Sequence, residues 1–266
     1  MLIREITDAI EQYAPLRLQE EWDNAGIQVG NPEAEITGIL LCTDATEAVV
    51  VEAISLGYNL VISHHPLIFR GLKKIMGRTP VERTVAMAIK HDITIYSAHT
   101  NMDSAWQGVS FKMAEKIGMT DVEFLDDNRV DAYGDAESTS AGCGVIGNIA
   151  PAPATEVLKR VKAAFEVGAV RYSGNGYAII SRVALCGGAG GFLIDKAVAM
   201  GAQMYVTADM RYHDFLDNSK RIVVADIGHY ESEHFTKEIF LEIIQKKSPT
   251  FAVAYAKSET NQVNYL

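Results

Sequence analysis

The stretch GILLCTDATEAVVVEAISLGYNLVISHH, residues 38–65, decides the fold because it joins two short apolar runs through a helical segment. It predicts a strand over 36–43, a helix over 45–57 with Thr46 near its start and Gly57 at its end, and a strand over 59–63 that ends at two histidines. A further helix over 80–92 and a strand over 93–98 follow. Near-continuous apolar strands joined by crossover helices are typical of a buried parallel sheet.

The second half of the chain repeats this layout. Residues 182–214 can be laid on residues 38–69, and the spacing from Cys42 to Gly57 equals that from Cys186 to Gly201, with Asp209 opposite His65. We therefore expect an α/β fold of two similar parallel-sheet units flanking a central metal cleft. The first unit is expected over 1–125, and the second over 126–266. The latter begins with a linker that is rich in Asp, Gly, Ser and Ala and that could hold strands of its own.

Composition limits the classes of partner. The chain has 266 residues, 48% of them hydrophobic, a net charge of −10 and a pI of about 5.2. An acidic surface repels phosphate backbones and anionic lipid, so nucleic acid and membranes are not expected partners. A small anionic substrate could still bind where cations neutralise its charge locally. Residues 1–16 predict an amphipathic helix that lacks the apolar core of a signal peptide. The three cysteines form no C-x-x-C pair. We therefore expect a cytoplasmic protein.

Six side chains are candidate metal ligands: four histidines that lie within a few residues of predicted strand ends, and two acids, each four residues after one of these histidines. His99 with Asp103 and His229 with Glu233 are spaced i, i+4, so each pair would share one face of a helix. The adjacent His64 and His65 would point apart on an extended backbone, whereas at a turn they could serve two ions, or one could orient the other. Imidazoles with carboxylates suit Zn, Fe, Mn, Co or Ni better than Ca or Mg.

The remaining histidines fit ordinary structural roles. His91 follows a predicted helix, where the macrodipole favours it, and His234 is expected on an exposed helix flank. The glycine-rich segment 186–191 could present N–H groups to an anion, but a tight strand-to-helix turn is the favoured interpretation.

Six segments together resemble the Nif-three-like family of dinuclear metal-centre proteins, the GTP cyclohydrolase type two homologues. These are EWDNAGIQVG (21–30), ISHHPLIF (62–69), SAHTNMD (97–103), CGGAGG (186–191), TADMRYHD (207–214) and DIGHYESE (226–233). The resemblance implies two divalent metal ions per chain. Their ligands would be His64, His65, Asp103, His229 and Glu233, and Glu233 would bridge the two ions. The resemblance also implies a homohexamer, and the chain would be a short form without the family's central inserted domain.

The resemblance further implies a hydrolase in which metal-activated water opens the imidazole ring of a purine nucleotide. His99 would move the proton, and Arg70, Lys73 or Lys74 would lie near the triphosphate. The family's Gly-x-Gly-Arg-x-Gly stretch appears as GCGVIG (142–147), with Val145 where an arginine is common. A metal-dependent phosphoesterase and a non-catalytic metal-binding scaffold are the alternatives.

Overall fold

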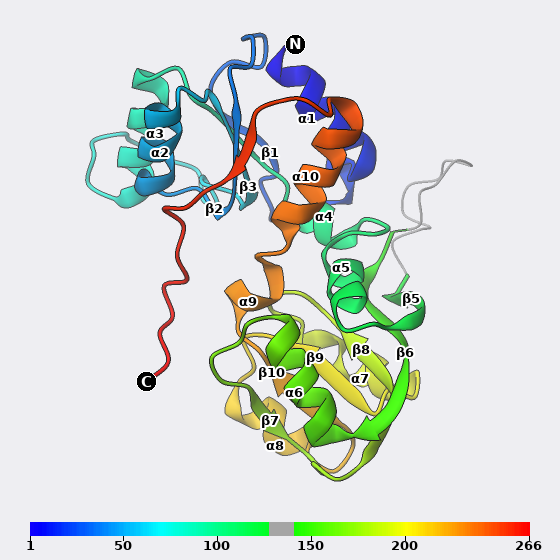
Figure 1. The fold of residues 1–266 in the computed structure, drawn as a ribbon. Coiled ribbons are helices and arrows are strands. Elements are labelled where there is room, and N and C mark those ends of the chain that lie inside the picture. Colours follow the sequence, from blue (N-terminus) through cyan, green and yellow to red (C-terminus); the bar gives the residue numbers. More distant parts are fainter. Residues whose placement is uncertain (128–140) are drawn as a thin grey trace. The chain divides into compact units, whose positions relative to one another are not determined.

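The computed structural model describes residues 1–127 and 141–266, and its contacts divide the chain into two compact units (Figure 1). Unit 1 comprises Met1–Met102 and Thr236–Gln262, and unit 2 comprises Asp103–Phe235 and Val263–Leu266. Each unit holds its own sheet.

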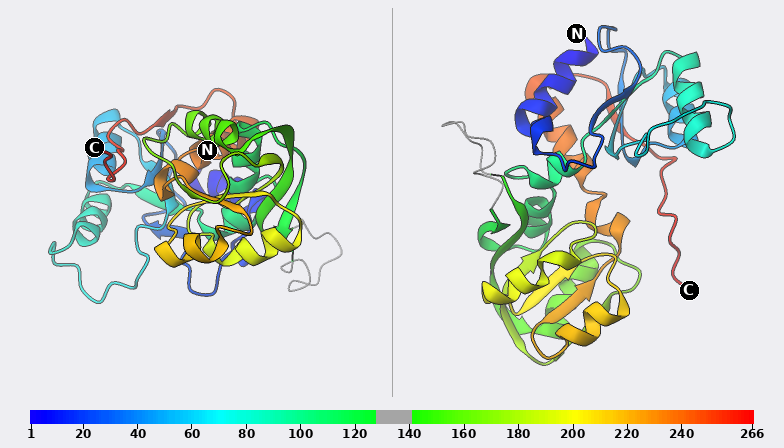
Figure 2. Two further views of the ribbon diagram at one scale, coloured as in Figure 1. Left: turned by 90° about the horizontal axis from the view of Figure 1, so that it is seen from below. Right: turned by 180° about the vertical axis from the view of Figure 1, so that it is seen from behind.

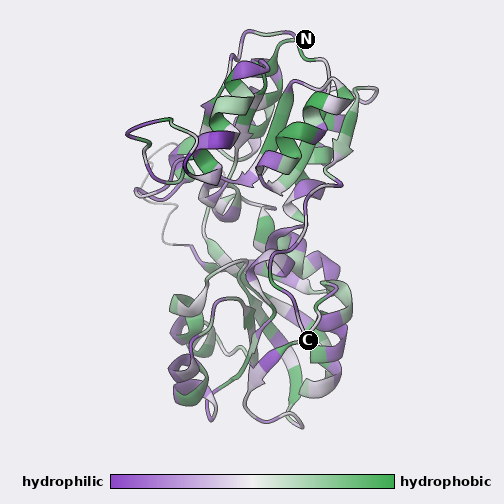
Figure 3. Ribbon diagram, turned by 90° about the vertical axis from the view of Figure 1, so that its left-hand side faces the viewer, coloured by the Kyte–Doolittle hydropathy of each residue, from purple (hydrophilic) through white to green (hydrophobic). Residues whose placement is uncertain are grey.

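The sheet of unit 1 has the strand order β1-β4-β3-β2-β11. The strands are β1 (Gly26–Val29), β2 (Ile39–Asp44), β3 (Leu60–His65), β4 (Thr94–Ser97) and β11 (Val253–Tyr255). All neighbours run parallel except β1, which pairs antiparallel with β4. The central strands β2, β3 and β4 are buried almost throughout, as expected of strands covered on both faces. Figure 3 shows hydrophobic residues, in green, in the helices and strands of each unit.

Helices cover both faces of this sheet. In Figure 1, α2 and α3 lie on one side of the strands, and α1 and α10 lie on the other. The helices of the unit are α1 (Ile3–Tyr13), the 3-10 turn η1 (Leu16–Leu18), α2 (Glu47–Leu56), α3 (Pro80–Lys90) and α10 (Thr236–Lys247), with α4 (Thr100–Ser104) spanning its boundary.

Local sequence explains where α2 begins and ends. The side chain of Thr46 accepts a hydrogen bond from the N–H of Val49, which satisfies one donor of the first turn. Gly57 ends the helix with φ 70°, a left-handed conformation that glycine adopts without a steric penalty. Both boundaries predicted from the sequence are therefore confirmed.

The sheet of unit 2 has the strand order β5-β6-β8-β9-β10-β7. Its strands are β5 (Thr120–Asp126), β6 (Cys143–Pro153), β7 (Arg171–Ser173), β8 (Ile179–Leu185), β9 (Met204–Thr207) and β10 (Val223–Asp226). Only β8, β9 and β10 are parallel, since β5, β6 and β7 each pair antiparallel with their neighbours.

Two apolar clusters cover the two faces of the second sheet. One packs α5 and α6 against the strands, and the other packs α7 and its neighbours, which Figure 2 shows in front of the sheet in its right-hand view. The helices are α5 (Val109–Lys116), α6 (Ala154–Ala164), η3 (Gly191–Leu193), α7 (Ile194–Ala199), α8 (Tyr212–Asn218) and α9 (His229–Glu233).

The fold confirms an α/β class but corrects two expectations. The sheets are mixed rather than parallel, because short edge strands add antiparallel to a parallel core in both units. The units also differ from the expected division at residue 125, because α10 and β11 return to the first sheet, where β11 pairs with β2. The expected linker contains β6, α6 and β7, and its residues 128–140 lie outside the described residues.

The predicted internal repeat appears as shared topology. The parallel strands β2, β3 and β4 correspond to β8, β9 and β10, and each trio carries an antiparallel edge strand beside its third member. Each third strand then leads into a short helix, α4 or α9. None of the helices in 1–127 and 141–266 has the length and apolar character of a membrane span.

Candidate metal centre

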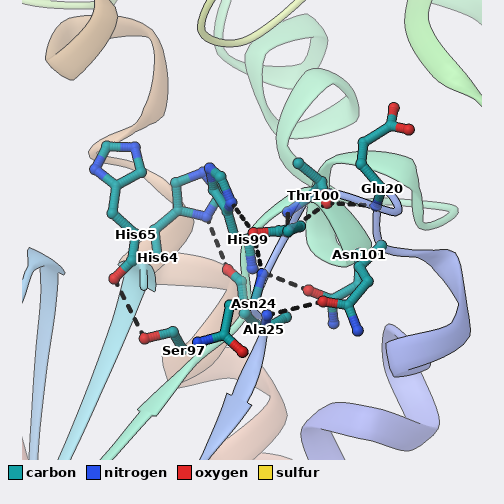
Figure 4. A network of polar contacts seen from close by, with 12 residues as sticks. Glu20, Asn24, Ala25, His64, His65, Ser97, His99, Thr100 and Asn101 are labelled. Carbon is teal, nitrogen blue, oxygen red and sulfur yellow. Dashed lines mark hydrogen bonds and ion pairs between the residues drawn. The ribbon is translucent and has the colours of Figure 1, made fainter. Parts of the chain in front are cut away.

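Three histidines of unit 1 gather at the carboxyl ends of its parallel strands. His64 and His65 are the last residues of β3, and His99 follows β4 by two residues. Their ring centroids lie 5.0–5.5 Å apart, and each ring offers a nitrogen within 4.8 Å of the others (Figure 4). The adjacent His64 and His65 are therefore not pointed apart. Ligands bind at this edge of open parallel sheets.

Each of these rings is held through its Nδ1 atom. The Nδ1–H of His64 donates to the carbonyl oxygen of Ala98 at 2.9 Å, and that of His65 donates to Oδ1 of Asp44 at 2.8 Å. The Nδ1–H of His99 donates to Oδ1 of Asp23 at 2.7 Å. Because the acceptors carry no proton, these bonds select the tautomer with the lone pair on Nε2, which is the arrangement found for metal-binding histidines.

Asp23 accepts hydrogen bonds from more than one residue. Its carboxylate also accepts hydrogen bonds from the backbone N–H and the hydroxyl of Thr100. Burial of the carboxylate raises its pKa, but the bonds from His99 and Thr100 outweigh burial and lower the pKa of Asp23 to about 2. Asp23 is therefore ionised at neutral pH and presents a negative charge to the Nδ1 side of His99.

Unit 2 contains a fourth histidine held in the same way. The Nδ1–H of His229 donates to Oδ2 of Asp209 at 2.7 Å, while its Nε2 lies 3.0 Å from Oε2 of Glu233. His229 and Glu233 are the first and last residues of α9, so the predicted i, i+4 pair shares one helix face. Two ligands of one zinc ion, each about 2.1 Å from it, lie about 3.0–3.4 Å apart, so this separation suits a shared ion.

Glu233 also approaches Asp103. A carboxylate oxygen of Asp103, on α4, lies within 4.8 Å of one of Glu233, which places Glu233 near both other candidate ligands of unit 2. The Glu233 side chain is only 4% exposed. A buried carboxylate between two other donors is suited to bridging ions, because a metal would compensate its charge.

The glycine-rich loop 186–191 supports Glu233 rather than presenting its N–H groups outward. The N–H of Gly188 donates to the Ser232 hydroxyl, and the N–H of Gly190 donates to Thr207. A Cβ on Gly188 would lie 2.3 Å from Oε1 of Glu233, so only glycine allows this approach. The geometry favours the tight-turn interpretation of this loop.

Cysteine chemistry does not enter this donor set. A hydrogen bond with Cys143, together with burial, raises the pKa of the Cys186 thiol well above its ordinary value. Cys186 is therefore a thiol at neutral pH. The nitrogen and oxygen donors fit a borderline divalent transition metal.

A cavity of about 700 Å³ adjoins His65 in unit 1. Its walls include Asp44, the first turns of α2 and α3, and residues of the segment that follows β11. The cations predicted to meet a phosphate, Arg70, Lys73 and Lys74, are exposed in the segment after β3 and do not line it.

Three carboxylates that orient the imidazoles, those of Asp23, Asp44 and Asp209, were not predicted from the sequence. The sequence singles out Asp209 only for its register with His65, and nothing in it marks Asp23 or Asp44 as a partner of an imidazole. Asp44 and Asp209 both lie at or just beyond the carboxyl end of a parallel strand, the same signal that identified the histidines. Asp23 had no such signal, since it lies before β1, 76 residues from His99.

The other sequence candidates have structural positions. Val145 is fully buried on β6, where it pairs with Leu185, so it does not replace a substrate-binding arginine. His91 is the C-terminal cap of α3, as expected. His234 is half-buried and stacks on Tyr230, in contrast to the exposed position that we expected.

Comparison with known proteins agrees with these features. A protein of Lactococcus lactis subsp. lactis (strain IL1403), named GTP cyclohydrolase 1 type 2 homolog, is 36% identical over 233 residues, covering 85% of each chain. The crystal structure of Staphylococcus aureus protein SA1388 superposes with a TM-score of 0.89 at 25% identity, covering 100% of this chain and 99% of that chain.

One similar protein aligns with this chain over a span longer than the chain itself. The Staphylococcus epidermidis protein, also named GTP cyclohydrolase 1 type 2 homolog, is 25% identical over 344 residues and matches 92% of this chain. That span exceeds the 266 residues present here, which is consistent with a short form. The family model for Duf34/NIF3 (NGG1p interacting factor 3) matches residues 1–263, and the chain therefore belongs to this family.

Proposed function

We propose that the protein is a hydrolase that depends on two divalent metal ions. In this proposal the ions would be held by His64, His65, Asp103, His229 and Glu233. The observation that carries the proposal is the shared pattern of four imidazoles, each held through Nδ1 and three of them by a carboxylate. Such anchoring fixes the ring orientation and increases the basicity of Nε2 as a ligand.

Bound ions would supply an activated water near neutral pH and would neutralise developing negative charge. The contribution of the chain is then to hold the ions and to move a proton. His99 is the proposed proton carrier, because its Nδ1–H donates to an Asp23 whose pKa is lowered to about 2. An ionised carboxylate behind an imidazole stabilises the imidazolium that forms when Nε2 accepts a proton.

The proposed substrate is GTP, on the strength of the name shared by the similar proteins. In the reaction, the oxygen of water bonds to C8 of guanine, the C8–N9 bond breaks, and N9 takes up a proton. The other proton of the water passes through His99 to N7, whose double bond to C8 becomes the single bond of a formamide, so the product is a formamidopyrimidine that contains one added water. No oxidant or reductant is required.

The experiment is a turnover assay with metal-loaded protein. Protein reconstituted separately with zinc, manganese or iron(II) is incubated with GTP, and products are analysed by mass spectrometry for the addition of one water. His99→Gln and the surface variant His213→Gln serve as a matched pair, and only the first is expected to lower turnover, by about 10²–10⁴-fold. Absence of the hydrated product with every metal contradicts the GTP assignment.

The same samples distinguish the alternative functions. Cleavage of bis(p-nitrophenyl) phosphate without GTP ring opening identifies a phosphoesterase, since a pair of metals also suits in-line displacement at phosphorus. Two bound ions without turnover of either substrate identify a metal-binding scaffold. The hexamer that the family resemblance implies is a separate prediction, which light scattering on the full chain tests.

A further inference from the structure

We propose that the cavity beside His65 is the subsite for the purine base of the substrate, and that the phosphates bind outside it. This inference rests on the proposed function. It deepens that function by assigning the parts of a nucleotide to different surfaces.

The cavity is of a size typical for a small-molecule site. Its volume of about 700 Å³ falls within the usual range of about 300–1,000 Å³. It opens where β2 and β3 end, between the first turns of α2 and α3. Its apolar wall includes Pro66, Leu67, Phe69 and Val81, which offers surface for a flat heterocycle.

Charge in the cavity disfavours a triphosphate. Three carboxylates line it, those of Asp44, Glu47 and Glu259, and no lysine or arginine is among the lining residues within the described chain. A polyphosphate is normally held by cationic side chains, and the described residues that line this cavity offer none. Guanine is uncharged at neutral pH and carries ring and amino N–H groups, for which a carboxylate is a suitable acceptor.

Two of these carboxylates are already committed to the protein. Glu47 forms a bidentate ion pair with Arg83, in which Nη2–H donates to Oε1 at 2.8 Å and Nε–H donates to Oε2 at 3.0 Å. Glu259 accepts from the backbone N–H groups of Thr43 and Asp44 and pairs with Lys237. These ion pairs and hydrogen bonds compensate the negative charges of Glu47 and Glu259, so the acidic wall is stable without a ligand.

Asp44 connects the cavity to the proposed metal centre. One of its oxygens accepts from Nδ1–H of His65, and its side chain is 49% exposed. A base in contact with Asp44 would therefore lie beside a proposed metal ligand. The hydroxyls of Thr46, Ser258 and Thr260 also line the cavity and provide further hydrogen-bonding groups.

Ala48 provides a direct test. It lines the cavity from the first turn of α2 and is exposed, so Ala48→Phe fills space without disturbing the core. Ala86 is exposed on α3 and does not line the cavity, so Ala86→Phe is the matched control. Isothermal titration calorimetry of the zinc-loaded full chain measures the binding of guanosine and, separately, of inorganic tripolyphosphate.

We expect guanosine to bind the parent protein and Ala86→Phe equally, and to bind Ala48→Phe at least about tenfold more weakly. Tripolyphosphate binding should be the same in all three proteins. Equal guanosine affinity in Ala48→Phe, no guanosine binding to the parent, or selective loss of tripolyphosphate binding overturns the inference.

Metal content and GTP turnover, measured on the same samples, separate this inference from the proposed function. Guanosine binding that depends on position 48 without GTP turnover keeps the subsite and rejects the hydrolase. Turnover with guanosine binding insensitive to position 48 keeps the hydrolase and rejects the subsite.

Discussion

The Nε2 atom of His229 lies 3.0 Å from Oε2 of Glu233, one helical turn further along α9. The opposite side of the imidazole is bound to Asp209, so the ring cannot turn away without breaking a 2.7 Å hydrogen bond. The pair is thus held at a separation that two ligands of one ion adopt. Preorganisation of this kind lowers the free-energy cost of binding the metal.

The first prediction concerns the charge of Glu233. Glu233→Gln keeps the size of the side chain but removes the negative charge, so the affinity for zinc should fall by at least about 100-fold. Competition with a chromophoric chelator measures this affinity. Glu156→Gln, at an exposed position on α6, is the control and should bind zinc like the parent. Unchanged affinity in Glu233→Gln would remove Glu233 from the ligand set.

The second prediction concerns the carboxylate behind His229. Asp209 has φ 56°, a left-handed conformation that asparagine tolerates, so Asp209→Asn removes charge with little backbone strain. Loss of such an orienting carboxylate weakens metal binding by about 10–100-fold, and the same chelator assay measures it. Asp217→Asn, exposed on α8, should have no effect. Equal affinities in the two variants would show that Asp209 does not orient a ligand.

The third prediction separates steric contact from backbone strain at a glycine. Gly188 and Gly201 both have positive φ, 59° and 79°, so alanine at either site costs about 1–2 kcal/mol of stability. Only at Gly188 does the added Cβ meet Glu233, since nothing lies within 4 Å at Gly201. Metal content per chain should therefore fall in Gly188→Ala and stay normal in Gly201→Ala. Equal metal content in both would contradict support of Glu233 by this loop.

Much of the fold could be predicted because the signals are local. The Thr46 cap, the Gly57 stop and the apolar runs of β2 and β3 each depend on residues close in sequence, and each was predicted correctly. The antiparallel edge strands and the return of β11 to the first sheet depend on pairing between distant segments, which periodicity does not encode.

The same distinction holds for the candidate site. Histidines that end strands are recognisable because strand ends are visible in the sequence, and the i, i+4 spacing of His229 and Glu233 predicted their shared helix face. The partner of His99 is Asp23, which precedes β1 and comes close only through the tertiary fold. Side chains that orient a ligand across such a separation in sequence can be identified only from the three-dimensional structure.

The fourth prediction uses the lowered pKa of Asp23. Its pKa falls from 3.8 to about 2 on folding, so the ionised carboxylate contributes about 2 kcal/mol of stability above pH 4, and this contribution is lost as the pH falls towards 2. Urea unfolding of metal-free protein should show Asp23→Asn less stable than the parent at pH 6, with the difference shrinking at pH 2.5. Asp217→Asn should match the parent at both values. A difference for Asp23→Asn that is independent of pH would contradict this assignment.

The most direct measurement of the central claim is anomalous X-ray diffraction from crystals of the zinc-loaded protein. We predict two peaks per chain, about 3.5–4 Å apart, with ligands from His64 and His65 as well as from His229 and Glu233. A single ion, or two ions separated by more than about 10 Å with each histidine set binding its own metal, would contradict a dinuclear centre and the hydrolase built on it.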